Sequence, residues 1–150
     1  EEETLMVKDL EKQYYDLPYN SSEKHVSLHR LIWHRNALEK IKNKELPRIT
    51  VPLQIFSLDR QCAFVFVPFE LLTLTAKKLE AILLNKGFDL AGIYILGYSN
   101  SVNGYLAPPE EIPFGGYEVN GSNEWYNLPP CDQSTEPTMI KWYEEKIKEL

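Results

Sequence analysis

The apolar run at residues 62–70, CAFVFVPFE, constrains the fold more than any other stretch of this chain. It is rich in Val and Phe and carries no charge before Glu70, which is typical of a buried β-strand. A second run that favours a strand, RITVPLQIFSL, occupies residues 48–58, and the tripeptide DRQ separates the two runs. This order predicts an antiparallel hairpin whose second strand is buried.

Helical patterns precede this hairpin. Residues 1–16 have the composition of a short acidic helix. Asn20 and Glu23 have the spacing of a capping box, which predicts a second helix that starts there and runs to about Lys44. Pro47 should end this helix, because proline lacks the backbone N–H group that a helix needs.

A helix and another strand follow the hairpin. The segment LTAKKLEAILLNKG at residues 74–87 has apolar residues at helical spacing. Thr75 can cap the start of this helix, and Gly87 should end it. The segment LAGIYILGYS at residues 90–99 then predicts a third, buried strand.

The C-terminal end predicts a final helix, with Thr135 as its cap and Pro137 in its first turn. The order β-β-α-β with flanking helices predicts an α/β (α+β-like) fold, in which helices pack on a small mixed β-sheet. With 150 residues, the chain has the length of one domain, so we expect residues 1–150 to form a single domain.

Charge and cysteine content narrow the class of protein. The net charge of −6 disfavours a nucleic-acid partner. Cys62 and Cys131 are too few for a disulfide framework, and Cys62 has the surroundings of a small core residue. Two Asn-X-Ser patterns are frequent by chance and leave the compartment open.

The stretch from residue 100 to about 134 shows no pattern of regular structure, and such long loops are often functional. It contains two Gly-Tyr pairs, Gly104-Tyr105 and Gly116-Tyr117. Glycine lets the backbone approach a ligand closely, and a neighbouring tyrosine can donate a hydrogen bond or bind a metal as phenolate. The alternative is that the tyrosines only pack the loop. The candidate supporting residues of this loop are Asn100, Gly104, Gly115 and Gly116.

Glu70 is a second candidate, because it ends the most apolar strand. A carboxylate at the exit of a buried strand is well placed to bind a ligand or to act as a base. The alternative is that the strand simply reaches the surface there.

The three histidines are weaker candidates for a binding site than Glu70 and the Gly-Tyr pairs. His25 and His29 are spaced i, i+4 on the second helix and could chelate a metal, but the sequence offers no third ligand nearby. An exposed helix face explains them better. His34 falls on the apolar stripe of the same helix, where a packed residue is the better interpretation.

Two segments together resemble one family. FVFVPFE…LLTLTAKKLE and then IYILGYSNSVNGYLAPPEEIPFGGYEV are similar to the C-terminal half of the catalytic domain of neutral (non-lysosomal) ceramidases. In that family a strand ends in Pro-Gly-Glu, a helix follows, and a second strand leads into an Asn…Gly-Tyr segment. A Gly-Gly-Tyr-Glu motif, residues 115–118 here, then closes the site. The resemblance covers roughly residues 50–120.

The resemblance implies a zinc-dependent N-acyl amide hydrolase that acts on an acyl-amide lipid such as ceramide. Glu70 and Tyr105 match two zinc ligands of the family, and Tyr117 matches the tyrosine that supports the transition state at the scissile amide. The two remaining zinc ligands are histidines in the N-terminal half of the family's domain, which this chain does not contain.

The chain does not begin with Met, which is compatible with a fragment, and the resemblance implies that it is the C-terminal part of a larger α/β catalytic domain whose partner is the N-terminal half. Zinc is then expected in the parent enzyme but not in this fragment alone, which should be inactive. Exposed apolar surface should also favour self-association. The alternative is a non-catalytic binding or assembly domain that keeps the fold.

Overall fold

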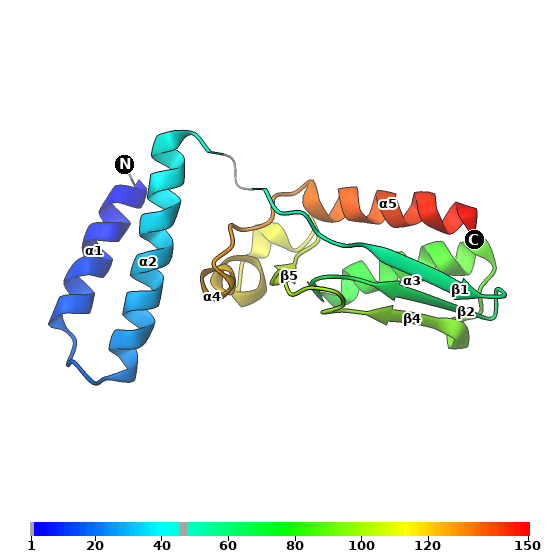
Figure 1. The fold of residues 1–150 in the computed structure, drawn as a ribbon, viewed down its shortest axis with the longest axis horizontal. Helices are drawn as coiled ribbons and strands as arrows, with labels where there is room; N and C mark the ends of the chain where they lie inside the picture. Colours follow the sequence, from blue (N-terminus) through cyan, green and yellow to red (C-terminus); the bar gives the residue numbers. More distant parts are fainter. Residues whose placement is uncertain (1, 46–47) are drawn as a thin grey trace. The chain divides into compact units, whose positions relative to one another are not determined.

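The computed structural model describes residues 2–45 and 48–150 of the chain (Figure 1). The chain divides into two compact units, residues 1–49 and residues 50–150. The assignment of both units to one catalytic domain of a larger protein stays a prediction. No helix in the described part of the chain is both long and apolar enough to cross a membrane.

The N-terminal unit is a hairpin of two helices, α1 (Glu2–Asp16) and α2 (Ser22–Asn43). Val7, Leu10 and Leu31 form its buried core. These apolar side chains recur on one face of each helix, which explains why two mostly polar helices pair.

One polar contact joins the two helices, and another caps the start of α2. His34 Nδ1 lies 2.7 Å from Glu3 Oε1, so His34 is a packed residue, as expected. The cap of α2 was predicted one residue too early: Ser21, not Asn20, accepts the hydrogen bond from the Lys24 N–H group at 3.1 Å. Either side chain can cap a helix, so sequence preference alone does not separate them. Pro47, the expected helix stop, lies outside the described residues.

The second unit contains a three-stranded sheet with the order β1-β2-β4. Its strands are β1 (Gln54–Leu58), β2 (Cys62–Phe66) and β4 (Ile93–Leu96). The predicted β1–β2 hairpin is confirmed as antiparallel, and β2 pairs with β4 in parallel, so the sheet is mixed. The predicted α/β fold with a small mixed sheet and flanking helices is therefore confirmed.

Two helices, α3 (Thr73–Lys86) and α5 (Thr135–Glu149), cover one face of this sheet (Figure 1). The core between the layers contains Ala63 and Val65 from β2, Leu79 and Leu83 from α3, and Met139, Tyr143 and Ile147 from α5. The Tyr143 hydroxyl group donates a 2.5 Å hydrogen bond to the carbonyl oxygen of Phe66, which ties α5 to the central strand.

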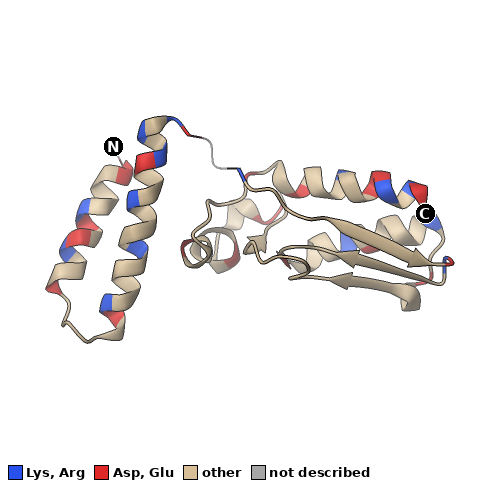
Figure 2. Ribbon diagram, in the orientation of Figure 1, with Lys and Arg blue, Asp and Glu red and all other residues tan. Residues whose placement is uncertain are grey.

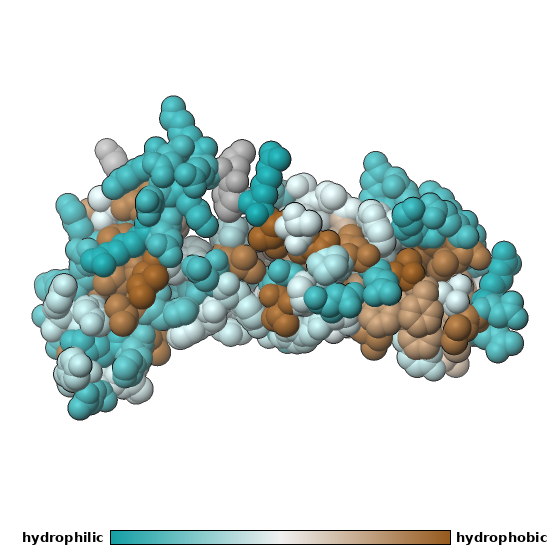
Figure 3. Space-filling model, in the orientation of Figure 1, coloured by the Kyte–Doolittle hydropathy of each residue, from teal (hydrophilic) through white to brown (hydrophobic). Residues whose placement is uncertain are grey.

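The opposite face of the sheet is open to solvent, which corrects the prediction of fully buried strands. Tyr94 of β4 is 43% exposed and Phe56 of β1 is 38% exposed. The rings of Phe56 and Phe64 stack at 4.8 Å between centroids, and those of Phe64 and Tyr94 at 4.9 Å. Figure 2 shows no charged residue in β1, β2 or β4, and Figure 3 shows apolar side chains gathered over the sheet. An apolar run therefore formed strands here without a second covering layer in this chain.

The ends of α3 and α5 differ in detail from the predictions. Leu72 stands at the N-cap of α3 without a side-chain cap, while Thr75 is buried inside the first turn. Thr135 is the first residue of α5 rather than its cap, and its hydroxyl group donates to Asp132 Oδ1 at 3.3 Å. Gly87 ends α3 as predicted, with a positive φ of 99° that favours glycine.

The segment from 100 to 134 is more regular than predicted. It contains the strand β5 (Tyr105–Leu106), the 3₁₀-helix η2 (Ile112–Phe114), the π-helix η3 (Tyr117–Gly121) and the helix α4 (Asn123–Tyr126). These elements are all short, so none produces a clear periodicity in the sequence. Strand β5 pairs in parallel with β3 (Glu70–Leu71) to form a second, two-stranded sheet.

Candidate functional site

Glu70 and Tyr105 face each other across the two-stranded sheet. They are register partners in the parallel β3–β5 pair, and the Glu70 N–H group donates to the carbonyl oxygen of Gly104 at 2.9 Å. The Tyr105 hydroxyl group donates a hydrogen bond to the Glu70 carboxylate, and this bond, with burial and nearby negative charge, raises the pKa of Tyr105 to about 12. Two residues far apart in sequence thus interact through their side chains, and the phenol of Tyr105 keeps its proton beside Glu70.

The backbone after β2 brings Glu70 to this position. Pro68 and Phe69 are buried, and the Phe69 side chain belongs to the core cluster. The carbonyl oxygen of Phe69 accepts from the Tyr98 N–H group at 2.9 Å, and Asn103 Nδ2 donates to the carbonyl oxygen of Pro68 at 2.8 Å. The loop after β4 is therefore bound to the chain segment that carries Glu70.

Tyr117 completes a cluster of three residues. Its ring lies edge-on to the ring of Tyr105, with 5.9 Å between centroids, and the residue is 53% exposed. Gly115 and Gly116, with positive φ of 65° and 105°, reverse the chain directly before Tyr117. The structure thus brings Glu70, Tyr105 and Tyr117 together, whereas their roles as zinc ligands and catalyst stay predictions.

Two of the predicted supporting residues have different surroundings. Gly104 lies in the site: a Cβ atom there would come within 3.1 Å of the Tyr126 ring, and φ is 74°. Asn100 instead donates through Nδ2 to Gln54 Oε1 of β1 at 3.2 Å, and no described contact joins it to Glu70 or Tyr105. Asn103, which sequence reasoning did not select, holds the loop at Pro68. Asn100 and Asn103 lie three residues apart in one polar loop, so the sequence alone did not show which of the two contacts the segment that carries Glu70.

Glu118 is the second residue that sequence reasoning did not assign. Its negative charge acts on Tyr105 and contributes to the raised pKa of that phenol, after the larger effect of the Glu70 hydrogen bond. The Gly-Gly-Tyr-Glu motif contained the signal, because Glu118 directly follows Tyr117. The site therefore places two carboxylates around one phenol.

An open hollow of about 390 Å³ lies beside Glu70. Its lining comes from β3, the start of α3 and the end of β4, and is mostly apolar. The lining residues are Glu70, Leu71, Thr73, Ala76, Ile95, Gly97 and Tyr98. A hollow with one carboxylate at its wall can accommodate an apolar group next to the Glu70–Tyr105 pair.

The donor atoms fit part of a zinc site. Glu70 and Tyr105 offer oxygen atoms, which zinc accepts, but catalytic zinc sites generally use three protein ligands, mostly with nitrogen or sulfur atoms. Within residues 2–45 and 48–150, no group of three or more His, Cys, Asp or Glu side chains is arranged to hold a metal ion. His25 and His29 lie on α2, in the other compact unit. Glu70 and Tyr105 alone therefore offer fewer donor atoms than such a site generally uses.

Comparison with known proteins gives no further assignment. No protein-family model, no curated protein and no solved structure matches this chain.

Proposed function

We propose that this chain is the C-terminal part of a zinc-dependent N-acyl amide hydrolase that resembles the neutral ceramidases. The observation that carries the proposal is the convergence of Glu70, Tyr105 and Tyr117 from three separate segments. The family resemblance assigns a site role to each of these three positions. The proposed substrate is an acyl-amide lipid such as ceramide.

In the proposed enzyme, Glu70 and Tyr105 hold the metal through their side-chain oxygens. Zinc, when bound, supplies the nucleophile by lowering the pKa of water to about 7. Tyr105 must release its proton to act as a ligand, and its pKa of about 12 makes this release costly without further positive charge. The remaining ligands, histidines in the proposed N-terminal half, complete the site.

Tyr117 acts on the substrate in this proposal. Tyr117 is half-exposed and lies outside the β3–β5 pairing, and its hydroxyl group donates a hydrogen bond to the amide oxygen as negative charge develops there. The apolar hollow beside Glu70 holds a hydrocarbon part of the lipid next to the reacting amide.

The isolated chain provides the first test. Calorimetric zinc titration and a ceramide-hydrolysis assay on the same sample should show neither tight binding nor turnover, because Glu70 and Tyr105 alone offer fewer donor atoms than a zinc site generally uses. Stoichiometric sub-micromolar binding that Glu70→Gln abolishes, or turnover above the blank, would show that the 150 residues form a complete site and would overturn the proposal of a fragment.

A second candidate function is a non-catalytic binding or assembly domain that keeps this fold. The open apolar face of the sheet favours it, since such a face is typical of a surface that another chain covers. Self-association through this face is part of the proposal. The upstream sequence of the parent gene separates the two functions: two strands that carry histidines favour the enzyme, and their absence favours the assembly domain.

A further inference from the structure

Glu136 is a buried carboxylate near the start of α5. The residue is 1% exposed, so its charge needs a close partner to offset the loss of hydration. Lys78 of α3 provides this partner: its Nζ atom lies 3.0 Å from Glu136 Oε1 and 3.3 Å from Oε2. The pair joins the two helices that cover the sheet.

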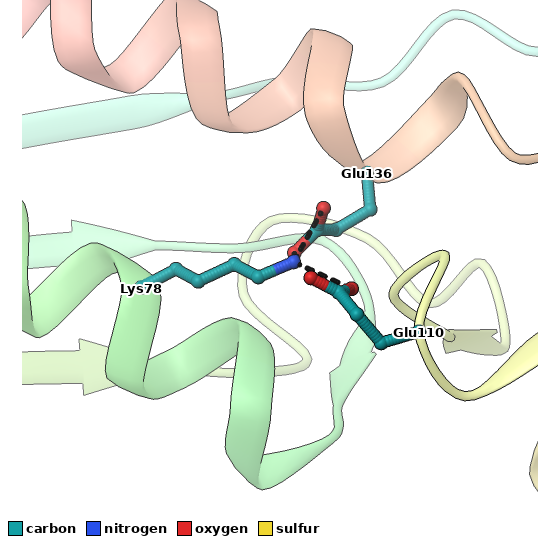
Figure 4. Close-up of polar contacts among 3 residues, drawn as sticks. All are labelled: Lys78, Glu110 and Glu136. Carbon is teal, nitrogen blue, oxygen red and sulfur yellow. Dashed lines mark hydrogen bonds and ion pairs between the residues drawn. The ribbon is translucent and has the colours of Figure 1, made fainter.

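The same ammonium group has a second partner outside the helices. Lys78 Nζ donates to Glu110 Oε2 at 2.9 Å, and Figure 4 shows the ammonium group between the two carboxylates. Burial alone would lower the pKa of Lys78, but the hydrogen bonds to Glu110 and Glu136 outweigh it and raise this pKa. Lys78 therefore remains charged and bridges three segments of the chain.

Glu110 lies between Tyr105 and Tyr117 in the chain. The link to Tyr105 is stiff, because Leu106, Ala107 and Pro108 are buried and proline restricts φ. The Glu111 N–H group donates to the carbonyl oxygen of Pro108 at 2.9 Å, which closes a turn around Glu110. The turn and the buried residues before it thus connect Glu110 firmly to Tyr105.

We propose that Lys78 is a positioning residue, which holds the segment between Tyr105 and Tyr117 against α3 and α5 and thereby sets the edge-on contact of the two rings. Glu136 holds the ammonium group of Lys78 between the two helices, and Glu110 binds the segment to this ammonium group. This inference rests on the proposed function only for the roles of the two tyrosines. The edge-on contact of the two rings is a property of the chain alone and needs neither metal nor substrate.

Glu110→Gln is the sharpest test variant. It removes the negative charge through which the segment pairs with Lys78 but leaves the Lys78–Glu136 pair intact, and the Glu110 side chain is exposed. Lys78→Met is less useful, because it leaves Glu136 buried without a counter-charge and threatens the fold. Glu111→Gln is the matched control, since it also removes one negative charge, at the neighbouring residue.

The measurement is NMR of the chain with isotope-labelled tyrosine rings, without zinc or substrate. Glu110→Gln should weaken the ring-to-ring cross-peak between Tyr105 and Tyr117 and shift the signals of these two rings, with no change in thermal midpoint. Glu111→Gln should leave the cross-peak and the shifts as in the wild type. Because neither metal nor activity enters the readout, its result is independent of the zinc proposal.

Two outcomes would overturn the inference. In one, the cross-peak between Tyr105 and Tyr117 persists in Glu110→Gln at wild-type intensity. In the other, Glu110→Gln shifts all tyrosine signals together and lowers the thermal midpoint, which would mean that the contact only stabilises the fold.

Discussion

The Tyr105 hydroxyl group donates a hydrogen bond to the carboxylate of Glu70, its register partner in the parallel β3–β5 pair. Leu71 and Leu106 of this short pair of strands pack in the core, and the same pairing places the side-chain oxygens of Glu70 and Tyr105 next to each other. In the proposed function, a metal ion would bind the oxygen atoms of these same two side chains. Proton and metal therefore compete for the same oxygens in the proposed function.

The first prediction concerns the raised pKa of Tyr105. Glu70→Gln should lower the pKa of Tyr105 from about 12 toward its ordinary value of 10.0, because the anionic acceptor that stabilises the neutral phenol is lost. NMR titration of ¹³C-labelled tyrosine rings measures this pKa. Glu118→Gln is the control and should produce a smaller decrease, since Glu118 acts only through its charge. An unchanged pKa in Glu70→Gln would mean that the two side chains do not bond.

The second prediction concerns the hydrogen bond between Tyr143 and Phe66. Tyr143→Phe should lower the free energy of unfolding by about 1 kcal/mol, because the variant loses the donor to the Phe66 carbonyl oxygen. Urea unfolding at neutral pH measures this change. A variant as stable as the wild type would argue that the hydrogen bond is absent in solution.

The pH dependence of the same variant is a third prediction. Burial raises the pKa of Tyr143 above its ordinary value of 10.0, so the folded protein holds this proton more tightly than the unfolded chain. The contribution of Tyr143 is complete below pH 10.0 and is lost as the pH rises above that value. The wild type should therefore lose stability above pH 10.0 more steeply than Tyr143→Phe does. Parallel pH profiles for the two proteins would contradict this explanation.

The open face of the sheet leads to a prediction about association. Phe56→Lys should reduce self-association of the chain in sedimentation velocity, because it places a charge among the stacked rings of Phe56 and Phe64. Leu84→Lys is the matched control, since Leu84 is 41% exposed but belongs to α3. A wild type that is monomeric at high concentration, or an equal effect of both variants, would argue against association through the sheet.

Local sequence signals predicted the parts of the fold that depend on neighbouring residues. The β1–β2 hairpin and the end of α3 at Gly87 are confirmed, because turn and cap chemistry act over a few residues. The exposure of Tyr94 was not predicted. An apolar run shows that a strand forms, but whether a second layer covers its outer face depends on the rest of the molecule.

The sequence indicated the residues of the site only where a local motif marks them. Motif residues such as Tyr117 carry their own signal in the sequence, and the structure places them near Glu70, while their roles stay predictions. The bridge from Lys78 to Glu136 carries no such signal, because it joins residues from two helices that meet only in the folded chain. Long-range polar pairs of this kind become visible only with the tertiary structure.

A further prediction concerns the role of Tyr117 in the longer enzyme that we propose. Tyr117→Phe should leave zinc bound and slow turnover about 100- to 1,000-fold, because only a hydrogen bond to the developing oxyanion is lost. Zinc content and steady-state kinetics on one preparation separate the two effects. Loss of zinc in this variant would mean that Tyr117 is a ligand rather than the oxyanion donor.

Zinc titration of the longer protein tests the central claim most directly. Calorimetry should show stoichiometric binding to the wild type and much weaker binding to Glu70→Gln and Tyr105→Phe, because each substitution removes an anionic ligand. Tyr117→Phe serves as the control that keeps both ligands. Wild-type zinc affinity in both Glu70→Gln and Tyr105→Phe would contradict the assignment of this pair as zinc ligands.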